Sequence, residues 1–485
     1  MRWSRNEHPF TRARAGVLAC VLLLGAGAAR ATVGIENVTV APRDARTATV
    51  RFDISWKNSW RHEANHDAAW VFFKVRADGQ SAWQHVRLAA DKVLNPTGYG
   101  RGKGTSVDLI VPDGDDGFTG MFVRRAGYGA PGTLSARAVT AVWDVKANQG
   151  IKGIGKAQIR AFGIQMVYVA EGPFYLGSGG SEVNGFYKYT DGKQHTLPYR
   201  VTSAGAIPTG RQTGKLWARS SEPLYPKSAQ PENNGEIPAS FPNGYSAFYC
   251  MKHPIAWGQY AGFLNTLPAA DANERYPYHT GARVGAPGVG RTDAITRSGQ
   301  APNYTYSTKS KWSSRRGYGG FGLSWADGTA FAAWAGLRPV TELELEKAVR
   351  GPREPVPDET GPSYWGIRPF AIGAWHSSKC GQFERAVTAG NAAGRRFAGT
   401  HGRGTPVPPA DWPQDDAVGA GIRCSPFAMR RISAPSISQQ VTRDDLLDMP
   451  RARLSDRFYA AFASPQRHPN YRWRGVRTAP KEVGP

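Results

Sequence analysis

The sequence is poor in cysteine and in acidic residues. It has 4 cysteines in 485 residues, and no two of them have the spacing of a CxxC pair or of a zinc site. Asp and Glu number 38 against 61 Lys and Arg, a formal charge of +23. After residue 31 no apolar run is long enough to cross a bilayer, and no repeat of fixed period occurs. These absences exclude a disulfide-rich scaffold, a solenoid and a helical membrane protein as interpretations.

The first 31 residues have the pattern of a cleaved secretory signal. Four arginines precede an apolar run at residues 15–29, and Ala29-Arg30-Ala31 follows it. The sequence therefore predicts an exported protein, periplasmic or secreted. The alternative for this segment is a lipid anchor on Cys20, which few apolar residues precede. Cleavage after residue 31 would remove five arginines and Glu7, which lowers the formal charge from +23 to about +19.

A basic exported chain favours anionic partners. No basic patch with interleaved aromatic residues is present, so nucleic acid is not an expected partner. The expected contact is an anionic glycan, a membrane surface outside the cytoplasm or a protein at the cell envelope. The composition also has a plain interpretation, in which basic side chains are solvated and spread over the surface.

Residues 32–163 are predicted to form an antiparallel β-sandwich. Apolar and polar residues alternate at 48–56, which is the period of a half-buried strand. Similar short runs follow, separated by Gly, Pro, Asn and Asp with no convincing helix between them. Their positions are 70–75, 107–111, 121–123, 138–145 and 159–169.

The rest of the chain combines long irregular stretches, at about 178–244 and 268–320, with short helices. Ser324 and Asp327 form a capping pattern before one helix, which Gly336 closes. Thr341 and Glu344 do the same for the next helix, which Gly351 ends. A further helix is predicted at 256–267. Apolar residues alternate with arginines at 471–477, as in an edge strand.

Several of these segments, taken in order, resemble the formylglycine-generating enzyme, or sulfatase-modifying factor, family. The matching segments are 166–169 with the Gly-Pro-Phe-Tyr-Leu-Gly-Ser turn at 172–178, the helix at 259–265, Ser324-Trp325-Ala326-Asp327, Thr341-Glu342-Leu343-Glu344, 421–423 and 473–477. The resemblance implies an α+β fold: the sandwich followed, at 164–480, by a sulfatase-modifying-factor-like domain. That domain is related to C-type lectins and poor in regular secondary structure, and residues 481–485 form a tail.

The chemistry of that family depends on residues that this chain lacks. The resemblance implies a pair of cysteines five residues apart, shortly after the strand at 421–423, because two thiolates hold copper(I). Here Arg423 and Cys424 are the only candidates, and no cysteine follows Cys424. The calcium motif of the family is altered to Gly381-Gln382-Phe383-Glu384. No cofactor is therefore predicted, and copper or calcium is expected only if the chemistry of the family is retained.

The three cysteines left after export are Cys250, Cys380 and Cys424, and spacing does not reveal how they pair. Cys424 is expected to be a small buried or disulfide-bonded residue rather than a reactive thiolate. The function predicted on these grounds is binding or scaffolding without thiol–copper oxidation. The alternative is a metal-dependent oxidoreductase of the same family with a non-standard site. A sulfoxide synthase lacks support, since no helical bundle with three histidine ligands precedes the domain.

One further motif points to different chemistry. Residues 62–66 read His-Glu-Ala-Asn-His, which matches the HExxH of zinc metalloproteases. In those enzymes two histidines one helical turn apart bind zinc, so His62 and His66 are candidate ligands only if the pentapeptide is helical. It stands between two predicted strands in a stretch with no apolar helical stripe, and a solvated loop is the competing interpretation.

Overall fold

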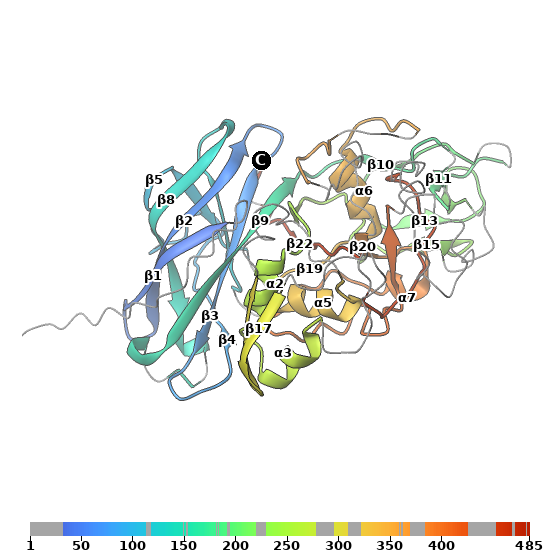
Figure 1. The fold of residues 1–485 in the computed structure, drawn as a ribbon. Coiled ribbons are helices and arrows are strands. Elements are labelled where there is room, and N and C mark those ends of the chain that lie inside the picture. The colour runs from blue at the N-terminus through green and yellow to red at the C-terminus, as the bar shows by residue number, and fades with distance from the viewer. Residues whose placement is uncertain are drawn as a thin grey trace, which may run out of the picture.

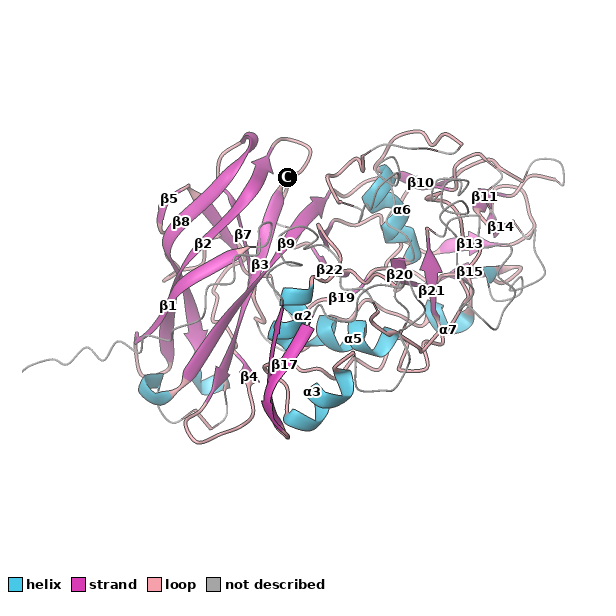
Figure 2. Ribbon diagram, viewed as in Figure 1, coloured by secondary structure: helices cyan, strands magenta, loops and turns pink. Residues whose placement is uncertain are grey.

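The structure is a computed structural model, and it is mostly antiparallel sheet with few helices (Figures 1 and 2). The predicted signal, with Cys20, and most of the altered calcium motif lie outside the described residues. Within them, no helix has the length and apolarity needed to cross a membrane. The residues that the structure describes are 33–112, 118–148, 150–151, 154–180, 182, 184–191, 195–219, 229–277, 295–308, 322–357, 359, 362–368, 384–424, 453–467, 471–481 and 483–485.

Two packed sheets form the sandwich in the first third of the chain. The first has the order β1-β2-β8-β5. Buried and more accessible residues alternate along β2 as the sequence pattern predicts, and Val50, Phe52 and Ile54 point into the core. The bounds in this sheet are β1 Gly34–Pro42, β2 Thr47–Arg61, β5 Lys103–Gly104 and β8 Gly129–Asp144.

The second sheet has eight strands and continues beyond the sandwich. Its order is β19-β22-β16-β9-β3-β7-β6, with β4 paired to β3. Its central strand β9 spans the expected domain boundary at 163/164 and pairs with β3 on one side and β16 on the other. The bounds are β3 Asp67–Arg76, β4 Gln84–His85, β6 Val107–Ile110, β7 Met121–Arg125, β9 Gln158–Val169, β16 Phe248–Met251, β19 Arg338–Pro339 and β22 Gly475–Thr478.

This second sheet is covered on both faces, which explains the composition of β3. Val71 and Phe73 pack into the core shared with the first sheet, whereas Trp70 and Phe72 pack into the core on the opposite face. Nine of its ten residues are consequently buried. A strand without polar alternation is expected where a sheet has cover on both sides.

The short helices lie on the face of this sheet that points away from the first sheet, and farther out in the second part of the chain (Figure 1). Ser324 caps α5 and Thr341 caps α6, each in a reciprocal capping box, so both predictions are confirmed. The helix predicted at 256–267 is also present, as α2. Their bounds are α2 Trp257–Leu264, α3 Ala269–Arg275, α5 Trp325–Trp334, α6 Glu342–Arg350 and α7 Ala392–Arg395, with 3₁₀ turns η1 Val145–Ala147 and η2 Ile154–Lys156.

Short strands supply most of the remaining regular structure, several of them in the stretches expected to be irregular. They pair as β10 with β12, β20 with β21, β17 with β18, and in the order β11-β14-β13-β15. The bounds are β10 Phe174–Leu176, β11 Phe186–Lys188, β12 Tyr199–Val201, β13 Ile207–Thr209, β14 Leu216–Ala218, β15 Gly235–Ile237, β17 Ile295–Gln300, β18 Asn303–Thr308, β20 Glu384–Val387 and β21 Ala420–Arg423.

The prediction of an edge strand at 471–477 is wrong. β22 pairs with β16 on one side and with β19 on the other, so it is an interior strand. Its alternating arginines are not solvated, because Arg474 and Arg477 are 2% and 1% exposed. Part of the positive charge of the chain is therefore inside the protein rather than spread over its surface.

Side chains of β3 tie the sandwich to the carboxyl end of α5. Trp70 Nε1 donates to the carbonyl oxygen of Ala335 at 2.8 Å. Lys74 Nζ donates to the carbonyl oxygens of Trp334 and Gly404 at 2.7 and 2.6 Å. A basic group at a helix C-terminus meets carbonyls that have no partner within the helix. The two parts of the chain are thus joined by specific polar contacts as well as by a shared sheet.

Candidate functional site

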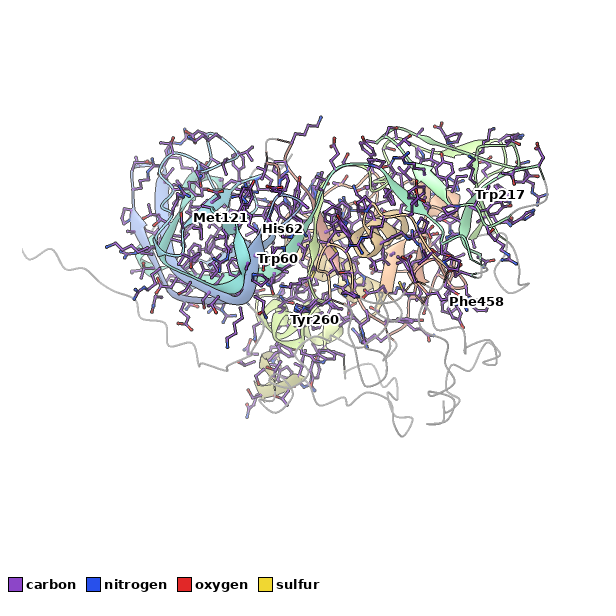
Figure 3. All side chains as sticks on the ribbon, turned by 90° about the horizontal axis from the view of Figure 1, so that it is seen from above. Trp60, His62, Met121, Trp217, Tyr260 and Phe458 are labelled. Carbon is purple, nitrogen blue, oxygen red and sulfur yellow. The ribbon has the colours of Figure 1, made fainter. Side chains whose placement is uncertain are left out.

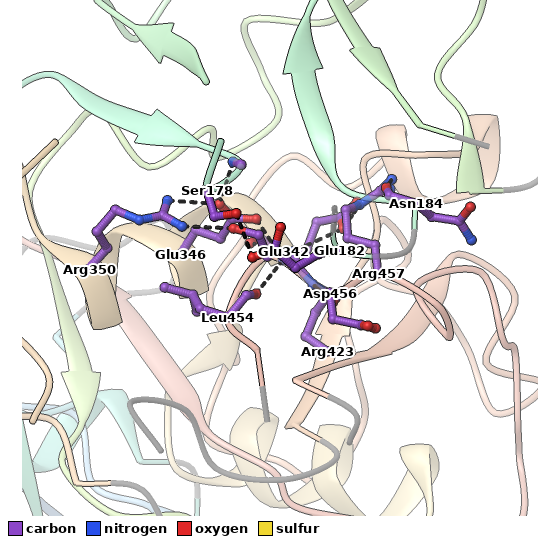
Figure 4. A network of polar contacts seen from close by, with 12 residues as sticks. Ser178, Glu182, Asn184, Glu342, Glu346, Arg350, Arg423, Leu454, Asp456 and Arg457 are labelled. Carbon is purple, nitrogen blue, oxygen red and sulfur yellow. Dashed lines mark hydrogen bonds and ion pairs between the residues drawn. The ribbon is translucent and has the colours of Figure 1, made fainter. Parts of the chain in front are cut away.

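The candidate residues Arg423 and Cys424 lie at the end of β21. Arg423 belongs to a buried network of acids and arginines (Figure 4). We call it the acid–arginine network. It begins on α6, where Glu342, Glu346 and Arg350 follow one another at intervals of four residues. Residues four apart share one face of a helix, so all three project in the same direction. Its members are Glu342, Glu346, Arg350, Glu359, Arg423 and Arg457.

Arg423 connects two carboxylates of α6. Its Nη1 lies 3.1 Å from Glu342 Oε2, and its Nη2 lies 2.6 Å from Glu346 Oε1. It also donates to the backbone carbonyls of Leu454 and Asp456. The guanidinium is 1% exposed, and every nitrogen of its side chain has an acceptor. Arg423 is therefore held as a structural cation and presents no free donor to a substrate.

Two more arginines complete the charge balance. Arg457 Nε lies 2.8 Å from Glu342 Oε2, so its carboxylate partner is Glu342 rather than the neighbouring Asp456. Arg350 pairs with Glu346 at 3.0 Å and with Glu359 at 2.7 Å. Three acids thus face three arginines, all of them buried. Buried charges are tolerated where each is paired and hydrogen-bonded.

Two arginines of the network keep Glu342 ionised. Burial alone would raise the pKa of Glu342, but Arg457, Arg423 and the hydroxyl of Thr388 outweigh it and lower that pKa below its ordinary value. Burial likewise opposes the charge of Arg350, yet Glu346 and Glu359 raise its pKa. Glu342 is consequently a fixed carboxylate at neutral pH, and a general acid or base in that range is not what this arrangement provides.

The network also joins segments that are far apart in the sequence. The N–H of Gly177 donates to Glu346 Oε2 at 2.9 Å, and Arg350 Nη1 donates to the carbonyl of Tyr175 at 2.6 Å. The glycine-rich turn, the Thr-Glu-x-Glu helix and the strand ending at Arg423 therefore meet in one place. Ser178 donates to Glu182 at 2.5 Å beside them. Three of the segments that suggested the family resemblance converge on a common polar core.

Neither described cysteine is a reactive thiolate. Cys424 is disulfide-bonded and fully buried, which confirms the expectation of a buried or bonded residue. Cys250 is free, but it is fully buried in β16, and burial raises the pKa of its thiol to about 12. A low-pKa, accessible thiol is the requirement for copper(I) binding and disulfide exchange, and these two residues do not meet it.

The HExxH pentapeptide is a tight turn between β2 and β3. Its residues form no helix, and the ring of His62 accepts hydrogen bonds from the backbone N–H groups of Ala64 and Asn65. His62 is exposed near the junction of the two parts (Figure 3), whereas His66 is fully buried and 3.0 Å from the Tyr249 hydroxyl. The pentapeptide thus lacks the helix that the zinc site of metalloproteases requires. Within the described parts of the chain, no three metal-ligating side chains are grouped.

Sequence reasoning identified Arg423 and missed its partners. Thr341 and Glu344 were recognised as a cap, but the acidic and basic residues on the opposite face of the same helix were not. The spacing of Glu342, Glu346 and Arg350 was an available signal, because opposite charges four apart on a helix commonly pair. Comparisons with protein-family models, with curated proteins and with solved structures found no match.

Proposed function

We propose that this chain is an exported, sulfatase-modifying-factor-like protein that binds or scaffolds at the cell envelope and does not carry out thiol–copper oxidation. The observation that carries the proposal is the state of the expected reaction centre. Cys424 is buried in a disulfide, and Arg423 beside it is fully occupied by two carboxylates and two segments of backbone. A residue set of this kind stabilises a fold and does not turn over a substrate.

The convergence of the glycine-rich turn, α6 and β21 supports the family resemblance behind this proposal. In a part of the chain built from short helices and strands, those segments need a specific internal contact to stay together. The acid–arginine network supplies it through charge-assisted bonds from its side chains to backbone and to one another. An anionic glycan or an envelope protein is the proposed partner, because the chain keeps a large excess of basic residues.

An oxygen-uptake assay tests the proposal. The purified protein is titrated with copper(I) and mixed with a cysteine-containing peptide, and oxygen consumption is recorded. We expect no peptide-dependent uptake above that of a Cys250→Ser/Cys424→Ser variant. Peptide-dependent turnover that this double variant loses would overturn the proposal and favour the oxidoreductase alternative. Fractionation of cells that produce the full chain tests export, and retention in the cytoplasm would contradict it.

A further inference from the structure

A second site with a buried arginine, separate from the acid–arginine network, is centred on Arg385, which has no carboxylate partner among the described residues. It lies where β20 meets the segment that leads into β22, and the backbone N–H of Arg385 donates to the carbonyl of Arg472 there. Arg385 is 1% exposed. Its guanidinium lies 5.4 Å from the ring centre of Trp325 and 4.9 Å from that of Tyr471. The side chain is thus enclosed by two aromatic rings.

The hydrogen-bonding capacity of Arg385 is only partly used. Its Nη2 donates to the carbonyl of Ser464 at 3.0 Å and its side chain has a hydrogen bond with Tyr471, whereas Nε and Nη1 have no acceptor of good geometry among the described residues. Trp473 packs with its ring centre 5.7 Å from that of Trp325, and its Nε1 has no acceptor in the described part of the chain either. A buried donor without a partner destabilises the folded protein. Both unsatisfied atoms of Arg385 are donors, so a group complementary to them would be an acceptor.

No described carboxylate neutralises Arg385. The adjacent acid is Glu384, but neighbouring residues of a strand point to opposite faces, and Glu384 Oε1 accepts from Arg474 instead. Burial lowers the pKa of Arg385 to about 10, and the one neighbour that opposes this shift is Tyr471. Burial lowers the pKa of Arg472 to about 9 despite Glu384. In the acid–arginine network, unlike at Arg385, each arginine has its acid.

We propose that this group of residues is an internal oxyanion site, in which Arg385 binds an ion of the size of sulfate or phosphate. An oxyanion offers acceptors and no donors, which matches the two unsatisfied donors of Arg385. It also supplies the negative charge that a buried guanidinium needs. Cation–π contacts with Trp325 and Tyr471 hold the guanidinium in place for this role. The site is independent of the proposed envelope partner.

Thermal unfolding with three forms of the protein tests the site. Wild type, Arg385→Met and the control Arg477→Met are unfolded in chloride, sulfate and phosphate at matched ionic strength. Arg477 is also buried without a carboxylate partner among the described residues, but it lies over Trp70. We expect a saturable rise in wild-type Tm of at least about 3 °C with sulfate or phosphate, a similar rise in Arg477→Met and none in Arg385→Met.

Two results would overturn the proposal. One is an equal response of wild type and Arg385→Met to sulfate and to phosphate, which would make Arg385 a packing residue only. The other is loss of the response in Arg477→Met as well, since any buried arginine would then be equivalent. If Arg385→Met does not fold, equilibrium dialysis of the wild-type protein against radiolabelled sulfate and phosphate decides the question. About one ion per chain supports the site, and no saturable binding refutes it.

Discussion

Replacing Glu342 with glutamine tests how much the acid–arginine network contributes to stability. The substitution keeps the shape of the side chain and removes its charge. In the native protein this carboxylate accepts from Arg457 at 2.8 and 3.1 Å, from Arg423 at 3.1 Å, and from Thr388 and the backbone N–H of Ala389. Arg457 has no second carboxylate among the described contacts, so its buried charge loses its counter-charge.

Breaking one side of a buried ion pair typically costs about 3–5 kcal/mol, because the other charge stays buried. We expect Glu342→Gln to lower the free energy of unfolding by that amount at pH 7, measured by urea unfolding with an unchanged m-value. Glu354→Gln is the control. Glu354 is an exposed carboxylate that accepts from the Tyr175 hydroxyl, and its loss should change stability by less than about 1 kcal/mol.

The pH dependence of stability provides a second test with the same variant. The pKa of Glu342 is lower in the folded protein than in the unfolded chain. The stabilisation that ionised Glu342 provides is therefore complete above its pKa in the unfolded chain, near 4.5. It disappears as the pH falls through its pKa in the folded protein. Wild type and Glu342→Gln should converge in stability as the pH falls through that range. A loss below about 1 kcal/mol at pH 7, or a constant difference at all pH values, would refute the reasoning.

Two further predictions concern other buried positions. Burial lowers the pKa of Lys347 to about 7, and its Nζ donates to the carbonyl of Tyr245. Between about pH 7 and 10.5 the unfolded chain then binds more protons than the folded protein, so the stability of the wild type should rise with pH over that range. Lys347→Met should lack this rise. In urea unfolding at pH 7 it should be about 2–4 kcal/mol more stable than the wild type. In α5, a Cβ on Gly328 would lie 2.2 Å from the Trp473 ring, so Gly328→Ala should lower the free energy of unfolding by about 1–3 kcal/mol. Gly258→Ala is the control and should not lower it, because a Cβ on Gly258 would meet nothing within 4 Å.

Local signals in the sequence were sufficient for several elements of the fold. The alternation at residues 48–56 identified β2, and the caps at Ser324 and Thr341 identified α5 and α6. Each of these signals lies within about ten residues. Periodicity and helix caps depend on residues that are close together in the chain, so they can be recognised in a single sequence.

The failures involve contacts between distant residues. Arginines alternating with apolar residues at 471–477 predicted an edge strand, because charged side chains normally need water. Arg474 is instead paired with Glu384, 90 residues away, and donates to three backbone carbonyls. The partners of Glu342 in the network, Arg423 and Arg457, are 81 and 115 residues away. Local patterning carries no information on such pairs, so the buried charges could not be located from it.

The most direct test of the proposed function is the reactivity of Cys250 and Cys424 in the native protein. Purified protein is treated with iodoacetamide without reductant, before and after denaturation, and the two cysteine peptides are analysed by mass spectrometry. Burial of Cys250 and the disulfide of Cys424 predict no labelling of either residue in the native state, and labelling of Cys250 alone after denaturation. Rapid labelling of Cys424 in the native protein would show an accessible thiolate and contradict the proposal.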